Sequence, residues 1–234
     1  MSERPDPGRT SAEPGPPGSS DRWFWAVVAG VVLYAILDII AQVLPPHYSA
    51  ITQAESDLAV GPYGWIMSIN FVNRGAFSLL FLVALAGWIR RNGSSLEPYR
   101  VGIALQGIWG VGALLLAAFP TDVPSTPVSW HGAIHLVVAI LAFIGGCLGT
   151  LMLTLRLERQ ESLRTLRPYL LVIGALSVLF LLVDLGLPFV APRVADRVGG
   201  LTERLLLGSV LLWIFVLSFY LGWKHPGGRA AATD

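Results

Sequence analysis

Six long apolar runs divide this chain, and each is long enough to cross a lipid bilayer as a helix. A helix rises about 1.5 Å per residue, so roughly 20 residues span about 30 Å of hydrocarbon. Backbone amides in lipid have no water to pair with, and these runs lack the period-two alternation of barrel strands, so each run is expected to be helical. We place the runs at about 23–44, 65–89, 101–119, 129–154, 168–190 and 202–223.

The composition agrees with a membrane protein. Apolar residues make up 54% of the chain and charged residues 13%, whereas a soluble domain carries about 25% charge. The net charge of +1 gives no reason to expect a nucleic-acid partner. The one cysteine, Cys147, excludes an intrachain disulfide and a multi-cysteine metal cluster. The predicted fold class is all-α: a polytopic bundle of six transmembrane helices whose partner is the lipid bilayer.

The arginines predict the orientation of this bundle. They precede the first run and follow the second and fourth, whereas the loops at 45–64 and 120–128 contain no Lys or Arg. By the positive-inside rule, both termini are expected in the cytoplasm. The Arg-, Ala- and Gly-rich composition favours a bacterial plasma membrane. We expect a disordered N-terminal tail rich in Pro, Gly and Ser, a transmembrane domain and a short cytoplasmic C-terminal tail, at residues 1–21, 22–224 and 225–234.

Ionisable and amide side chains gather in the outer halves of the predicted spans and in the outer loops, whereas the inner halves carry almost none. This asymmetry predicts a polar pocket that faces outward. A lipid headgroup, a small solute or protons are the ligands expected there. The candidate ligand-binding residues are Asp38, Ser56, Asp57, Asn70, Arg74, Asp122, His131, His135, Asp184 and Glu203.

Arg74 is the most demanding of these residues. It lies about nine residues into its span, roughly 14 Å deep, where an isolated charge costs about 2.5–3.5 kcal/mol or more. It must therefore face the bundle interior, and Asp38 and Asp184 are the carboxylates at similar depth. Two interpretations remain open: a structural ion pair that sets helix register, or the charged floor of a binding pocket.

His131 and His135 are four residues apart, which places both rings on one helix face. Such a pair can hold a metal ion such as Zn²⁺ when further ligands come from elsewhere, and Asp184 is the predicted third ligand, with Asp122 and Glu203 as other candidates. The alternatives are histidines that pair with carboxylates or carbonyls, and a proton-handling role near neutral pH.

Two further segments carry structural predictions. In the first outer loop, "ITQAESDLAV" is mildly amphipathic and predicts a short interfacial helix that covers the bundle; Ser56 and Asp57 equally fit a helix cap without chemistry. Gly145 and Gly149 form a G-x-x-x-G pattern, which is typical of close helix packing.

Several of these motifs together resemble a known membrane family. "YSAITQAESDLAVGPYGWIMSINFVNRG", "FPTD" and "HGAIH" are similar to the pattern of the bacterial family catalogued as domain of unknown function 998, over roughly residues 25–222. Glu55 stands where that pattern has an apolar residue. The resemblance implies a multi-helix membrane fold and no particular activity. A remoter resemblance, through one Ser, one Asp and two His, is to the intramembrane zinc hydrolases such as the alkaline ceramidases.

Three function classes follow. The first is a membrane protein that binds or transports a ligand through its outer pocket. The second is a metal-dependent hydrolase of a lipid-like substrate, in which a metal-bound water attacks as hydroxide. The third is a structural or accessory protein whose polar cluster only holds the bundle together.

Overall fold

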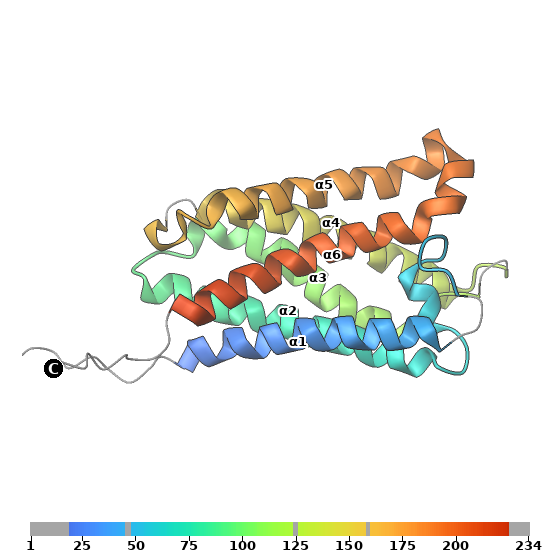
Figure 1. Cartoon of the computed structure of the whole chain (residues 1–234), viewed down its shortest axis with the longest axis horizontal. Helices are drawn as coiled ribbons and strands as arrows, with labels where there is room; N and C mark the ends of the chain where they lie inside the picture. The colour runs from blue at the N-terminus through green and yellow to red at the C-terminus, as the bar shows by residue number, and fades with distance from the viewer. Residues whose placement is uncertain (1–18, 45–47, 124–125, 158–159, 225–234) are drawn as a thin grey trace, which may run out of the picture.

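The computed structural model describes residues 19–44, 48–123, 126–157 and 160–224. Its regular structure consists of helices, with six long ones and three short 3-10 turns in the described part of the chain (Figure 1). All six long helices are apolar enough to span a membrane, which confirms the predicted fold class. They are α1 (Ser19–Val43), α2 (Gly64–Arg91), α3 (Arg100–Ala118), α4 (Trp130–Leu157), α5 (Arg167–Val190) and α6 (Pro192–Lys224).

The helices form a ring that follows the order of the chain. Each helix packs against its neighbours in sequence, and α6 closes the ring by packing against α1 (Figure 1). Consecutive spans cross the bundle in alternating directions (Figure 1). As a result, α2, α3, α4, α5 and α6 each contribute residues around one space toward the end of the bundle that holds the short helix η1 (Glu55–Ala59).

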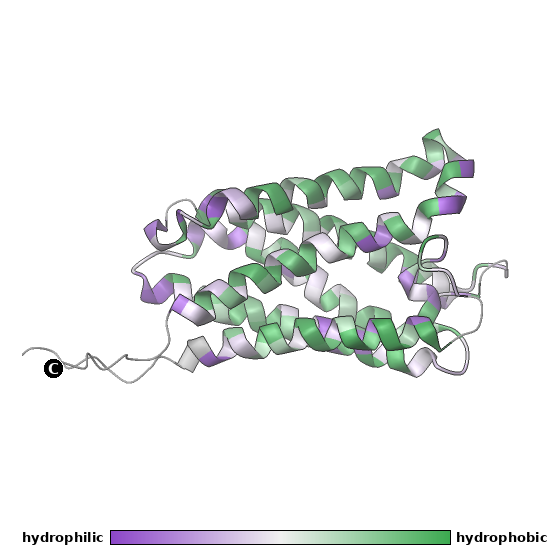
Figure 2. Cartoon of the chain, in the orientation of Figure 1, coloured by the Kyte–Doolittle hydropathy of each residue, from purple (hydrophilic) through white to green (hydrophobic). Residues whose placement is uncertain are grey.

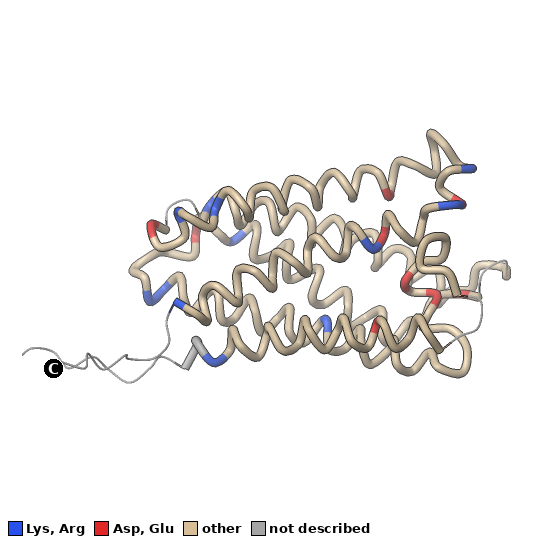
Figure 3. Tube along the Cα trace, viewed as in Figure 1, with Lys and Arg blue, Asp and Glu red and all other residues tan. Residues whose placement is uncertain are grey.

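The start of α1 and the end of α6 lie at the same end of the bundle, which Figure 3 shows to be rich in basic residues. Acidic residues gather toward the opposite end. This distribution matches the predicted charge asymmetry, while the assignment of the basic end to the cytoplasm stays a prediction. The N-terminal tail predicted at 1–21 lies outside the described residues except where α1 begins, and the tail predicted at 225–234 lies wholly outside them.

Large apolar side chains fill the bundle interior. Trp88, Trp109 and Trp213 are almost fully buried, and Phe81 meets Trp213 edge to face at 5.5 Å between ring centroids. The indole N–H of Trp213 donates to Thr154 Oγ1 at 2.7 Å, so a buried polar atom is satisfied inside the apolar core. Apolar side chains also cover the outside of the helices, as expected for a lipid-facing surface (Figure 2).

Two boundaries differ from the sequence prediction. Helix α6 begins at Pro192 rather than near residue 202, because proline is well suited to a first helical position. At 33 residues it is the longest helix and extends over about 50 Å, so its first turns reach beyond the hydrocarbon. The helix expected within the first outer loop is present as a short 3-10 helix, η1 (Glu55–Ala59), which contacts α2 and α6.

The close packing predicted from the G-x-x-x-G pattern is confirmed between α3 and α4. A Cβ atom added at Gly145 would lie 2.6 Å from the carbonyl oxygen of Leu105, and one at Gly149 would lie 2.9 Å from the backbone nitrogen of Gln106. Side chains larger than hydrogen do not fit at either position without moving a helix.

We therefore expect Gly145→Ala to destabilise the protein by about 1–3 kcal/mol, because the new methyl group must push α3 and α4 apart. Thermal melting of the protein in detergent measures the change. Gly208→Ala is the matched control, since a Cβ atom at Gly208 meets nothing within 4 Å. Equal melting temperatures for the two variants would contradict the close-packing argument.

Candidate functional site

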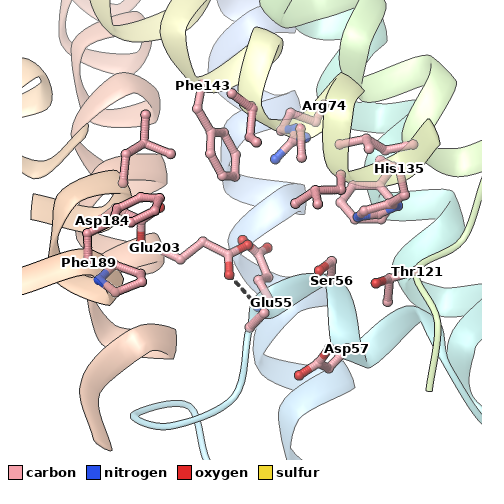
Figure 4. Close-up of a pocket in the computed structure, with 18 residues that line it drawn as sticks. Glu55, Ser56, Asp57, Arg74, Thr121, His135, Phe143, Asp184, Phe189 and Glu203 are labelled. Carbon is pink, nitrogen blue, oxygen red and sulfur yellow. Dashed lines mark hydrogen bonds between the residues drawn. The ribbon is translucent and has the colours of Figure 1, made fainter. Parts of the chain in front are cut away.

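The polar end of the bundle encloses a cavity of about 490 Å³. It lies between η1 and the parts of α2, α3, α4, α5 and α6 nearest to η1 (Figure 4). Six of the ten predicted ligand-binding residues line it: Ser56, Asp57, Arg74, His135, Asp184 and Glu203. The other four, Asp38, Asn70, Asp122 and His131, are not among its lining residues.

Arg74 is buried in the cavity wall, with 1% of its surface exposed. Its guanidinium carbon lies 5.2 Å from the ring centroid of Phe71 and 4.7 Å from that of Trp109, so aromatic faces stabilise its charge. The Nε and Nη2 atoms of Arg74 have no hydrogen-bond partner. Arg74 therefore lines the cavity and carries two buried donors that no acceptor of the described residues satisfies.

The ion pair expected for Arg74 is not formed, because no nitrogen–oxygen contact of 4.0 Å or less joins it to Asp38 or Asp184 in the described part of the chain. Both carboxylates have other partners. Asp38 accepts a hydrogen bond from Gln42 Nε2 at 2.5 Å, and Asp184 accepts one from Thr202 Oγ1 at 2.8 Å.

The two histidines lie in different surroundings. His135 is 4% exposed and lines the cavity, and its Nδ1 lies 2.7 Å from the Phe119 carbonyl oxygen. That contact fixes Nδ1 as the donor, so the neutral ring presents an unpaired Nε2 as an acceptor. His131 is exposed instead, and its ring stacks on Trp130 at 3.5 Å.

The three predicted zinc ligands lie in different surroundings. His131 is exposed and is not among the residues that line the cavity with His135 and Asp184, and the described residues include no group of three or more His, Cys, Asp or Glu side chains placed to hold a metal ion. A zinc ion at His131, His135 and Asp184 stays a prediction.

Asp122 and Asn70 bond to neighbouring segments rather than to the cavity. The carboxylate of Asp122 accepts hydrogen bonds from the backbone N–H and the hydroxyl of Ser129, at 2.8 and 2.5 Å, and these bonds hold the pKa of Asp122 below its usual range. Asn70 Nδ2 donates to the Tyr34 carbonyl oxygen at 3.2 Å, which ties α2 to α1.

Arg204 holds the first outer loop against α6. Its Nη1 lies 3.0 Å from the carbonyl oxygens of Ala50 and Gln53 and 3.1 Å from that of Gly200, and its Nη2 donates to the Tyr48 hydroxyl. The backbone N–H of Leu201 adds a 3.0 Å bond to the Ile51 carbonyl oxygen. These contacts fix the loop that carries η1 over the cavity.

Glu55 is the main residue that the candidate set lacked. Its side chain is 3% exposed and accepts a hydrogen bond from the Tyr34 hydroxyl, while its backbone N–H donates to Glu203 Oε2 at 3.2 Å. Burial and the nearby Asp38 carboxylate raise the pKa of Glu55 to about 7. The sequence did carry one indication that Glu55 is unusual, because the pattern that the chain resembles has an apolar residue at this position.

The pKa of Glu55 predicts a dependence of stability on pH. Its carboxyl stays protonated in the folded protein between its ordinary pKa of 4.5 and about 7, whereas the unfolded chain releases that proton. The free energy of unfolding therefore falls as pH rises through this window, by on the order of 3 kcal/mol in total.

We expect Glu55→Gln to flatten this fall, because an amide does not titrate. Melting temperatures measured in detergent across this pH window check the difference between the two proteins. Glu161→Gln is the control, because Glu161 is exposed in the short turn η3 (Glu161–Leu163), which joins the end of α4 to the start of α5. Parallel pH curves for wild type and Glu55→Gln would show that Glu55 holds no extra proton.

Replacement of Arg204 tests how the loop is held. Lysine lacks the guanidinium fork, so Arg204→Lys is expected to lose several hydrogen bonds, on the order of 2 kcal/mol. Hydrogen exchange of the amides at 50–57 would then become about tenfold faster or more. Arg197→Lys, at an exposed position of the same helix, should leave exchange unchanged. Unchanged exchange in Arg204→Lys would show that other contacts hold the loop.

Comparison with known proteins places the chain in a family without assigning a function. A family model described as "Protein of unknown function (DUF998)" matches residues 28–220. No match was found among curated proteins or among solved structures.

Proposed function

The chain belongs to the DUF998 family of membrane-type helical proteins, and we propose that it binds an amphiphile whose polar headgroup occupies the outer cavity. The observation that carries this proposal is a single cavity with a polar interior and an apolar, lipid-facing rim. Arg74, His135 and Glu203 line its interior. Leu136 and Phe189 line the same cavity although 59% and 88% of their surfaces are exposed on the outside of the bundle.

The exposed rim residues indicate how a ligand would enter. Leu136 belongs to α4 and Phe189 to α5, so the cavity reaches the lipid-facing surface between these two helices. Helix α5 is also the least covered of the six, with 22% of its most apolar window buried. An amphiphile in the outer leaflet would place its headgroup inside and leave its chains along α4 and α5, without crossing a polar barrier.

Binding has more support than transport across the bilayer. Toward the basic end, the interior beyond Arg74 is filled by buried side chains such as Phe81, Leu85 and Trp213. A ligand path through this packed region would require large side chains to separate. The hydrolase alternative has less support, because His131 and His135 lie in different surroundings. We place the protein in a bacterial plasma membrane, with the cavity on the outer side, on the strength of the charge asymmetry.

A side chain that fills the cavity tests the proposal. Ala139 lines the cavity on α4, so Ala139→Phe is expected to displace the headgroup and to reduce the amphiphile retained by the purified protein several-fold. Mass spectrometry of lipids extracted after purification in mild detergent measures the retained amount. Leu136→Trp, at the rim, is a second variant in case the first perturbs folding.

Val137→Trp is the matched control, because Val137 is 56% exposed on the same helix and is not among the residues that line the cavity. Its retained lipid should equal that of wild type. If both cavity variants melt like wild type and keep the wild-type amount of lipid, the cavity does not bind an amphiphile, and a purely structural role for the polar cluster is favoured.

A further inference from the structure

Arg74 and two of the four carboxylic residues of the cavity lie on opposite sides of it, and the other two, Glu55 and Asp57, belong to η1. Arg74 lies on the side formed by α2, whereas Asp184 and Glu203 lie on the side formed by α5 and α6 (Figure 4). We propose that the headgroup is zwitterionic, with an anionic group such as a phosphate or carboxylate at Arg74 and an amine at Asp184 and Glu203. This inference rests on the proposed function, because it names the class of amphiphile that the cavity binds.

The anionic half of the ligand follows from the unused donors of Arg74. This guanidinium is 1% exposed, and its Nε and Nη2 lack hydrogen-bond partners. The rings of Phe71 and Trp109 offset part of the cost of burying its charge, but aromatic faces accept N–H groups only weakly. A phosphate or carboxylate accepts two parallel hydrogen bonds from a guanidinium and is therefore the anion best suited to the Nε and Nη2 donors of Arg74.

The cationic half follows from the carboxylates across the cavity. Asp184 accepts one bond from Thr202 and Glu203 one from the backbone N–H of Glu55. A carboxylate offers about four acceptor positions once it is ionised, and a bound ammonium group favours that ionised form. No Lys or Arg of the described segments forms an ion pair with either carboxylate. The guanidinium Nη1 and Nη2 of the nearby Arg204 bond to backbone carbonyls and to Tyr48 rather than to either carboxylate, and its buried Nε has no partner.

An ammonium group matches this side of the cavity in both charge and hydrogen bonding. Its three N–H donors suit two carboxylates with free acceptor positions. Phe143 and Phe189 also line the cavity, and an aromatic face attracts a cation beside it. On the opposite side, the unpaired Nε2 of His135 offers a further acceptor for a ligand hydroxyl.

A ligand of one charge satisfies only half of these groups. A purely anionic headgroup would pair with Arg74 but would add negative charge beside Asp184 and Glu203. A purely cationic headgroup would leave the Arg74 donors without partners in a site largely shielded from water, which is costly. A zwitterionic headgroup places its anionic group at Arg74 and its ammonium group at Asp184 and Glu203, so neither side of the cavity is left without a partner of opposite charge.

Three short-chain probes separate these possibilities in binding titrations with the full chain in detergent. They are dihexanoylphosphatidylethanolamine, which is zwitterionic, dihexanoylphosphatidylglycerol, which is anionic, and the dihexanoyl ester of aminopropanediol, which is cationic. We expect the zwitterion to bind about tenfold more tightly than either of the others, which corresponds to one charge-assisted hydrogen bond.

Variants at each side then assign the two charges. Asp184→Asn with Glu203→Gln should bind the zwitterion about tenfold more weakly and the anionic probe at least as tightly as wild type, because the opposing negative charge is removed, with Glu161→Gln as the exposed control. Arg74→Lys keeps the charge but loses the guanidinium fork, so it should weaken both phosphate-bearing probes and spare the amine. These opposite patterns are not produced by a general loss of folding.

Equal affinity for the three probes would overturn the zwitterion assignment and leave amphiphile binding intact. An equal loss of the zwitterionic and anionic probes in the Asp184, Glu203 double variant would also overturn it. If none of the three probes binds the wild-type protein, the proposed function fails together with this inference.

Discussion

Every polar group that this chain places in the hydrocarbon must find its partner inside the protein, and this constraint organises the structure. It requires each apolar run to be helical, because the backbone then bonds to itself. It also turns the few charged side chains inward and toward one end of the bundle, where they share partners. The Tyr34 hydroxyl donates to the side chain of Glu55, and the backbone N–H of Glu55 donates to the side chain of Glu203. Glu55 therefore links α1, η1 and α6.

The cavity is where this internal pairing leaves charged groups incomplete. Arg74 has donors without acceptors, and Asp184 and Glu203 have acceptors that no basic side chain of the described segments engages by an ion pair. Incomplete pairing of buried groups destabilises an empty bundle, and a bound headgroup would remove that penalty. Arg74, Asp184 and Glu203 therefore destabilise the bundle when the cavity is empty, and the same three side chains would make the cavity selective for a ligand.

The sequence predicted the helices well because a membrane span is recognised from its length and hydropathy alone. It also predicted close packing at Gly145 and Gly149, because small residues leave a clear pattern, but not that α3 is the partner helix. The site was predicted only in part. The depth of a residue in the membrane follows from its position along the helix, but the sequence does not show which neighbouring helix its side chain faces. Arg74 was therefore expected to form an ion pair with Asp38 or Asp184, and its guanidinium instead lies over the rings of Phe71 and Trp109.

The histidine pair shows the same limit. His131 and His135 share a helix face, yet His131 is one turn nearer the helix end, where that face leaves the interior and Trp130 stacks on the ring. Glu55 escaped prediction because an acid in a loop is ordinarily solvated, and only tertiary packing shows that it is buried.

The way Arg204 holds the first outer loop has a consequence for how this loop can vary among relatives. The guanidinium contacts the main-chain oxygens of Ala50 and Gln53, so it recognises the path of the chain and not the identity of these side chains. The side chain of Ala50 takes no part in this contact, whereas that of Gln53 also fixes the path of the loop, because its Oε1 accepts a hydrogen bond from the backbone N–H of Ser49 at 2.8 Å. We therefore expect the loop to tolerate substitution at Ala50 more readily than at Gln53 or Arg204.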